Sequence, residues 1–306
     1  MARIGRAGAG RKPVVACLMP KRLAACISLS IASLAAPGAA LAGEVVKPSS
    51  VTADVEVPAG GTSTVKLECP ATAIAVSGAV RQAGPAITVR RSTPGINAND
   101  WRFRLAADGT GDRRVSTVLR CVRLAVPPGV SGALLNVKTR SRLSVSIPAG
   151  GTTPVQLRCG APWLATGYGL EAGTSGDVRV ASAVPVTHGW DFVLENVGAA
   201  PVSAGVSARC LKQTVRAGSA ELRFRASRPS QANTLGPGRS ASFAHRCGPG
   251  LFSLATGVVL DPLATIELAA SGPVRKGWGR WAFREVSGGD RVRSFLVCLR
   301  TDSGFR

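Results

Sequence analysis

Cysteine is the residue type with the most chemical potential in this chain of 306 residues, and six of its eight cysteines are regularly spaced. The separations within successive pairs are 52 (69 to 121), 51 (159 to 210) and 51 (247 to 298) residues. The six are Cys69, Cys121, Cys159, Cys210, Cys247 and Cys298. In an oxidising compartment they are expected to form disulfides. The repeated spacing favours pairing within each pair (69 with 121, 159 with 210, 247 with 298) over pairing between neighbours (121 with 159, 210 with 247).

Few other groups in the chain could support catalysis. The only two histidines, His188 and His245, lie far apart in sequence, and no G-x-S-x-G or H-E-x-x-H segment is present. His188 is expected at the surface beside a turn, and His245 at the edge of a core. Carboxylates such as Glu171 and Asp177 stand singly, with nothing to mark an acid and base pair. We therefore expect a protein that is not an enzyme and that carries no cofactor and no metal.

The segments that must position the cysteines recur three times. The first cysteine of each pair ends VPAGGTSTVKLEC (57–69), IPAGGTTPVQLRC (147–159) and the looser LGPGRSASFAHRC (235–247). Small residues follow and are predicted to form turns, at 75–78, 165–167 and 255–257. The sequence thus predicts three units after a leader, at residues 43–130, 131–218 and 219–306.

Each unit also contains a W-x-F segment between its cysteines, beginning at Trp101, Trp190 and Trp281. In the third unit Trp278 would keep the spacing to the second cysteine, whereas Trp281 keeps the W-x-F pattern. We favour Trp281, because side-chain alternation constrains a strand more tightly than loop length does. The three tryptophans share the parity of the cysteines, so we expect them in the cores rather than on a carbohydrate-binding surface. Trp163 and Tyr168 are better candidates for an exposed aromatic contact.

Alternation with period two, as in Val51–Val57 and Val65–Cys69, predicts strands, and Pro and Gly clusters predict the turns between them. No segment after the leader reads as a helix, so the fold class is all-β, with one β-sandwich per unit. The layout resembles immunoglobulin-like architecture in general, and is similar to the cysteine-bracketed repeats of exported bacterial surface proteins. That resemblance implies a fold class and a location, and it carries over no catalytic residue.

Residues 1–42 have the properties of a secretory signal peptide. They contain no Asp or Glu, and an apolar run follows Lys21 and Arg22 and ends in Ala40-Leu41-Ala42. Translation could start at Met19, which would give this segment ordinary proportions. No later stretch has the length of a membrane span. The mature protein is therefore expected to be secreted, periplasmic or at the cell surface.

The formal net charge of the chain is +21, and much of it comes from arginine. If strands alternate, Arg102, Arg104 and Arg120 point away from the core around the first W-x-F segment, with Arg113 and Arg114 beside the turn. In the third unit Arg280, Arg284, Arg291 and Arg293 would share an outer face. These two Arg-rich hairpins are predicted anion-binding sites; the alternative is that the arginines are ordinary solvated surface.

The sequence favours an exported structural or interaction protein that associates with an envelope component or a partner protein. The alternative is a polyanion binder that contacts envelope polysaccharide, lipopolysaccharide or extracellular nucleic acid through the Arg-rich hairpins. A carbohydrate-active or other hydrolase is the third hypothesis, and no cluster of acid, base and nucleophile supports it.

Overall fold

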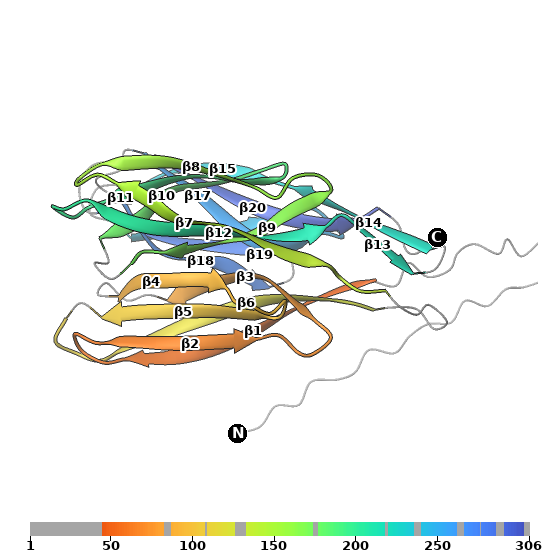
Figure 1. Ribbon diagram of the computed structural model, residues 1–306, viewed down its shortest axis with the longest axis horizontal. Coiled ribbons are helices and arrows are strands. Elements are labelled where there is room, and N and C mark those ends of the chain that lie inside the picture. Colours follow the sequence, from red (N-terminus) through yellow and green to blue (C-terminus); the bar gives the residue numbers. More distant parts are fainter. Residues whose placement is uncertain are drawn as a thin grey trace, which may run out of the picture. The chain divides into compact units, whose positions relative to one another are not determined.

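The protein is seen in a computed structural model that describes residues 45–82, 87–107, 109–125, 133–173, 177–217, 220–235, 240–261, 266–275, 277–285 and 291–302 (Figure 1). These residues form strands and turns without a helix. The predicted signal peptide, residues 1–42, lies outside the described residues. The all-β fold class predicted from the sequence is confirmed.

The strands around the first disulfide form two antiparallel layers. One is ordered β1 (Val46–Val57), β6 (Arg113–Leu124) and β3 (Ile74–Gln82). The other contains β2 (Thr62–Glu68), β5 (Asp100–Ala107) and β4 (Ile87–Pro94). Along β1 half-buried Val51, Ala53 and Val55 alternate with exposed polar residues, as in a strand with one face on a core. We call β1–β6 the first strand set.

The second and third strand sets repeat this pairing. In the second set, β12 (Val202–Lys212) lies between β7 (Val137–Ile147) and β9 (Trp163–Glu171), and β11 (Gly189–Asn196) lies between β8 (Thr152–Arg158) and β10 (Val178–Val186). In the third, β20 (Arg291–Thr301) pairs with β17 (Phe252–Asp261), β14 (Ala220–Ser227) and β15 (Ser230–Thr234). There β19 (Trp278–Glu285) lies between β16 (Ser240–Arg246) and β18 (Ile266–Arg275). The short β13 (Thr214–Ala217) pairs with β14.

One disulfide connects the two layers of each strand set. The bonds join Cys69 to Cys121, Cys159 to Cys210 and Cys247 to Cys298, with Cα–Cα distances of 5.7, 5.8 and 5.7 Å. All six cysteines are buried. The pairing is therefore the one within each pair that the spacing favoured.

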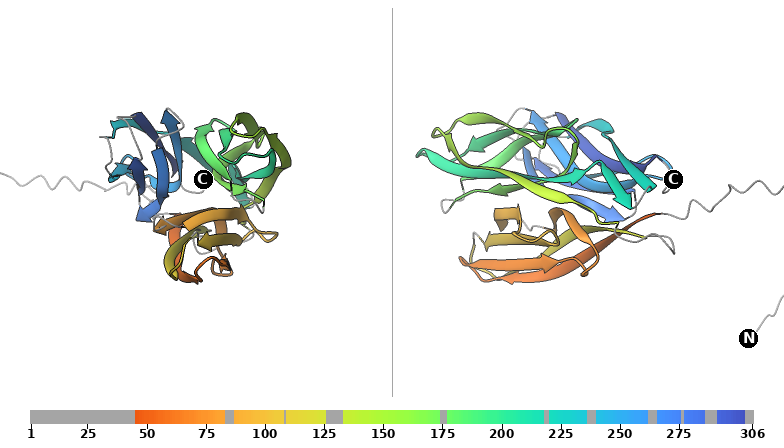
Figure 2. Two further views of the ribbon diagram at one scale, coloured as in Figure 1. Left: turned by 90° about the vertical axis from the view of Figure 1, so that its left-hand side faces the viewer. Right: turned by 45° about the vertical axis from the view of Figure 1, so that its right-hand side comes forward.

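The strand sets share sheets and do not stand apart. β4 of the first set pairs with β9 of the second through Ser92 and Leu170, and β10 of the second pairs with β17 of the third through Ala183 and Val258. β18 of the third set packs against β3 of the first. Each strand set thus contacts both others, as the orange, green and blue strands show in Figure 2. Residues 41–306 accordingly form one compact unit.

The small-residue segments predicted as turns lie inside strands β3, β9 and β17 at these contacts. A Cβ atom added at Gly167 would lie 2.3 Å from the carbonyl oxygen of Val76 in the first set. One added at Gly257 would lie 2.4 Å from the carbonyl oxygen of Ala183 in the second set. The turn prediction was therefore wrong at these positions. The residues are small because the backbone of a neighbouring strand set packs directly on them.

Trp101, Trp190 and Trp281 are each fully buried, and Trp278 is half-buried. Trp101 and Trp190 lie opposite Leu67 and Leu157, two residues before a cysteine. Trp281 instead lies opposite Phe243, two residues further from its cysteine, and Gly279 takes the place of the tryptophan. All three tryptophans point inward, but the pairing of β19 with β16 is displaced by two residues relative to the equivalent pairing in the other two sets.

Candidate functional site

The two Arg-rich hairpins predicted from the sequence are not hairpins. β5, which carries Arg102 and Arg104, pairs with β2 and β4, whereas β6, which carries Arg113, Arg114 and Arg120, pairs with β1 and β3. In the third set Arg280 and Arg284 lie on β19, and Arg291 and Arg293 lie on β20. In each of these sets the disulfide joins the two layers, and the consecutive strands that carry the arginines lie in different layers. The outer faces of the two layers point in opposite directions.

Arg120 points away from its own core, as predicted, but it does not reach solvent. Its side chain is only 3% exposed. Nε donates a hydrogen bond to the carbonyl oxygen of Ser253 at 3.0 Å, and Nη1 donates one to Ser50 Oγ at 3.0 Å. Burial lowers the pKa of the guanidinium to about 10. Arg120 does point away from its own core, but the third strand set covers that face.

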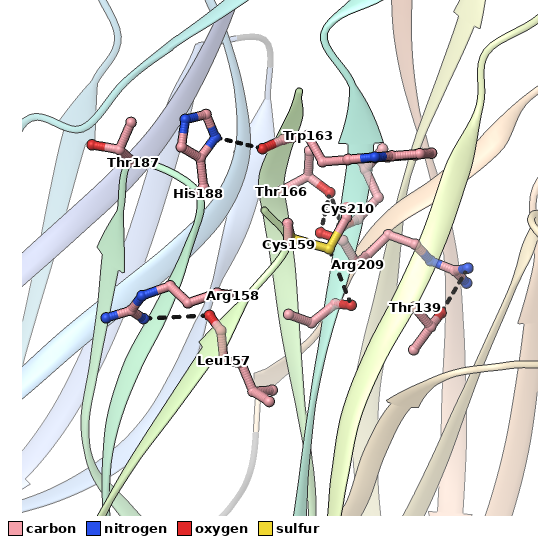
Figure 3. Close-up of a disulfide and its surroundings, with 12 residues drawn as sticks. Thr139, Leu157, Arg158, Cys159, Trp163, Thr166, Thr187, His188, Arg209 and Cys210 are labelled. Carbon is pink, nitrogen blue, oxygen red and sulfur yellow. Dashed lines mark hydrogen bonds between the residues drawn. A yellow bond between two sulfur atoms is a disulfide. The ribbon is translucent and has the colours of Figure 1, made fainter. Parts of the chain in front are cut away.

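Arg209 occupies the corresponding position of the second set, immediately before Cys210, and is 2% exposed. Its Nη2 donates to the carbonyl oxygens of Asn97 at 3.3 Å and Asp100 at 3.2 Å, both in the first set. Its Nη1 donates to Thr139 Oγ1 at 3.2 Å, beside the disulfide in Figure 3. Burial lowers the pKa of Arg209 to about 10, although the nearby charge of Asp100 acts in the opposite direction. The third set has Val297 at this position.

The remaining predicted arginines are dispersed, and several are close to carboxylates. Arg102 Nε lies 4.0 Å from Asp100 Oδ2, and Arg114 Nη2 lies 3.6 Å from Asp54 Oδ2. Arg280 Nε donates to Ser242 Oγ at 2.8 Å. Six predicted positions are exposed, namely Arg104, Arg113, Arg114, Arg280, Arg291 and Arg293. The side chain of Arg284 lies outside the described residues.

A denser arginine cluster, which the sequence analysis missed, lies where β13, β14 and β20 meet. It consists of Arg216, Arg223, Arg225 and Arg300, with side chains 78%, 69%, 64% and 54% exposed. Arg225 lies opposite Arg300 in the register of β14 and β20. Buried Leu222 and Phe224 fix the opposite face of β14. We call these four residues the arginine face.

Two carboxylates lie among the four arginines. Glu221 accepts hydrogen bonds from Arg223 Nε at 2.6 Å and Arg216 Nε at 3.2 Å. Asp302 accepts one from Arg225 Nε at 2.5 Å and lies 3.7 Å from Arg300 Nε. The hydrogen bonds from Arg223 and then Arg216 lower the pKa of Glu221. Four cations against two anions leave the arginine face with a net charge of +2. The alternation Leu-Arg-Phe-Arg at 222–225 is the sequence signal that could have revealed it.

Both histidines are involved in structural contacts. His245 is 6% exposed, its Nε2 lies 3.1 Å from Ser294 Oγ, and its ring centre lies 4.9 Å from that of Trp281. Burial lowers the pKa of His245. His188 is half-buried, with Nδ1 2.7 Å from the carbonyl oxygen of Trp163 (Figure 3). Ser294 is itself fully buried, so the Ser–His pair that it forms with His245 is not open to a substrate.

Trp163 and Tyr168, the two aromatic residues expected to be exposed, are each half-buried. The Tyr168 ring packs 4.7 Å from that of Trp190, and burial raises the pKa of Tyr168 to about 12. Lys138 Nζ lies 4.3 Å from the ring centre of Trp163. Tyr168 therefore belongs to the edge of the second core, and Trp163 is partly covered by a lysine.

Within the described ranges no group of three His, Cys, Asp or Glu side chains could hold a metal ion. Among the residues that the structure describes, no helix has the length and apolar character needed to cross a membrane. No protein-family model and no curated protein matches the chain.

Proposed function

We propose that this chain is an exported, non-catalytic interaction protein built from three disulfide-bridged β-sandwich repeats. The observation that carries the proposal is the burial of three disulfides, one in each strand set. Disulfides of this kind persist in oxidising compartments and are rare in the cytosol. The repeated strand pairing around each bridge supports the division into three repeats.

The non-catalytic part of the proposal is supported by how the reactive residue types are used. The six described cysteines are consumed in bridges. His188 and His245 make contacts with a backbone carbonyl and a serine hydroxyl. Two of the arginines, which could bind an anionic substrate, are buried between strand sets. An interaction protein needs a stable surface rather than a reactive centre. Cysteines, histidines and arginines that form structural contacts stabilise such a surface.

Cell fractionation of the full-length chain tests the proposal. We expect the protein in the periplasm or the medium, with a mature N-terminus at Gly43 and with free thiols absent on titration under denaturing conditions. A matched variant in which Ile31, Leu34 and Leu41 are replaced by Asp should stay in the cytosol and lack the bridges. A parent protein that keeps its N-terminal segment and titrates with six or more free thiols would contradict the export and the disulfide framework together.

Polyanion binding is the second candidate function, and the exposed arginine face favours it. Guanidinium groups form planar, paired hydrogen bonds with carboxylate, sulfate and phosphate groups. The test is retention of the oxidised protein on heparin, on DNA and on purified envelope polysaccharide across a salt series. We expect retention that falls steeply with salt. Elution from all three resins at the same low salt concentration that elutes the protein from an uncharged resin would exclude this function.

A further inference from the structure

We infer that the arginine face, formed by Arg216, Arg223, Arg225 and Arg300, is the binding site for an acidic polysaccharide. This inference rests on the second candidate function above and assigns it a location and a ligand class. The site differs from the Arg-rich segments predicted from the sequence, since it lies on β13, β14 and the end of β20.

The four arginine side chains project from one face of the sheet. Arg216 lies opposite Glu221 and Arg225 lies opposite Arg300, and residues opposite each other in antiparallel strands share a face. Arg223 lies two residues from Arg225 on the same strand and so projects to the same side. The opposite side of β14 is buried in the core through Leu222 and Phe224. The arginines therefore cannot turn inward without breaking this packing.

The contacts with carboxylates occupy only one part of each guanidinium group. In all four contacts with Glu221 and Asp302 the arginine atom is Nε. The two Nη groups at the end of each guanidinium supply four further N–H donors. The carboxylates are 28% and 23% exposed, well below the arginines, so they lie beneath the guanidinium groups. They hold each arginine at its base, and the ends of the side chains remain available to a ligand.

The arginine face and its two carboxylates together carry an excess of positive charge. Four guanidinium groups and two carboxylates leave a net charge of +2 on a surface of three neighbouring strands. Like charges on neighbouring strands repel one another. Alternating positive and negative groups would need no partner, but here the cations are in excess. A polymer with regularly spaced anions removes the repulsion, and several weak contacts along one chain add up to useful affinity.

A polysaccharide suits this face better than a nucleic acid. Single-stranded nucleic acids are held by stacking of bases on aromatic side chains as well as by charge. The outward positions of β13 and β14 hold Thr214, Arg216, Glu221, Arg223, Arg225 and Ser227, and none of them is aromatic. Uronate and sulfate groups require only hydrogen-bond donors and positive charge, which this face provides.

The experiment measures binding of the oxidised full-length chain to heparin, polygalacturonate and double-stranded DNA at several salt concentrations. In the face variant the four arginines are replaced, as Arg216→Gln, Arg223→Gln, Arg225→Gln and Arg300→Gln. In the control variant four exposed arginines that belong to no predicted anion site are replaced, as Arg123→Gln, Arg140→Gln, Arg142→Gln and Arg246→Gln. Both variants lose the same charge, and a melting curve of each shows whether it is folded.

We expect the dissociation constant for heparin and polygalacturonate to rise at least tenfold in the face variant and less than threefold in the control variant. The salt slope should also fall by about one for each ionic contact that is lost. Equal losses in the two variants would mean that total charge alone matters, and would overturn the site while leaving polyanion binding in place. Tighter binding of DNA than of either polysaccharide would overturn the ligand class.

A lysine variant separates geometry from charge. Replacement of the four residues of the arginine face by lysine keeps the net charge but removes the paired N–H donors. We expect this variant to bind about threefold to tenfold more weakly than the parent. Binding equal to that of the parent would refute the guanidinium argument. If the parent itself binds no polyanion, the second candidate function fails, and this inference fails with it.

Discussion

Replacement of Arg209 by methionine tests whether a buried arginine holds the first and second strand sets together. Methionine keeps much of the apolar stem but removes the donors to Thr139, Asn97 and Asp100. The carbonyl oxygen of Asp100 is the one fully buried acceptor of the three, and a buried acceptor without its donor costs about 1 to 3 kcal/mol, whereas each of the two part-buried hydrogen bonds contributes about 0.5 to 1.5 kcal/mol. Burial lowers the pKa of Arg209 to about 10 in the parent, so the cost of burying the charge offsets part of this stabilisation. We therefore expect a net loss of about 1 to 3 kcal/mol.

The assay is urea unfolding of the oxidised protein at pH 7, with Arg104→Met as the matched control. Arg104 is an exposed arginine on β5, and we expect its replacement to change the free energy of unfolding by less than about 0.5 kcal/mol. The dependence of the free energy on urea should have the same slope in all three proteins. A loss below about 1 kcal/mol for Arg209→Met, or equal losses in the two variants, would refute the assigned role.

The pH dependence provides an independent check on the same residue. The pKa of Arg209 is lower in the folded chain than in the unfolded one, so above about pH 10 the unfolded chain holds more of this proton than the folded chain does. This group therefore makes stability rise as the pH rises above about 10. Below about pH 10 the Arg209 guanidinium is charged in both the folded and the unfolded chain. The stability difference between Arg209→Met and the parent should consequently be the same at pH 6 and at pH 9.

Three further predictions concern the contacts within and between strand sets. Gly257→Ala places a Cβ 2.4 Å from a backbone oxygen and should cost about 1 to 3 kcal/mol in thermal unfolding, whereas Gly111→Ala, with nothing within 4 Å, should be nearly neutral. Because burial lowers the pKa of His245, stability should fall as the pH drops below about 6.5, and His245→Leu should lessen this fall when melting temperatures at pH 5 and 7.5 are compared. Each bridge closes a loop of about 50 residues, worth about 4 kcal/mol, so reduction should unfold the strand sets as followed by circular dichroism; an unchanged spectrum after complete reduction would contradict this.

The features that could be predicted from the sequence are those set by local spacing. The cysteine pairing followed from a separation that recurs three times, and the strands followed from alternation with period two. The two-residue displacement of Trp281 could not be predicted in this way. A W-x-F segment fixes which face a tryptophan takes, but the register against β16 depends on pairing along the whole strand.

The burial of Arg120 and Arg209 marks the limit of alternation as a guide. Period two states on which side of its own sheet a side chain lies, and both arginines do lie away from their own disulfides. The alternation contains no information about a neighbouring strand set that covers that side. The small residues at 165–167 and 255–257 were the available signal for such a cover, since strands that admit close backbone approach need them. These segments were interpreted as turns, and so the close packing of another strand set was not predicted.

The strand sets are thus held by two separate systems of contacts. Within each set a disulfide and a buried tryptophan fix the two layers. Between sets the backbone pairing is short, with two register pairs joining β4 to β9 and two joining β10 to β17. So few backbone hydrogen bonds would not define a register by themselves. The buried donors Arg120 and Arg209 each bind particular backbone oxygens of another set, and so they select one register among the close-packed alternatives that small residues permit.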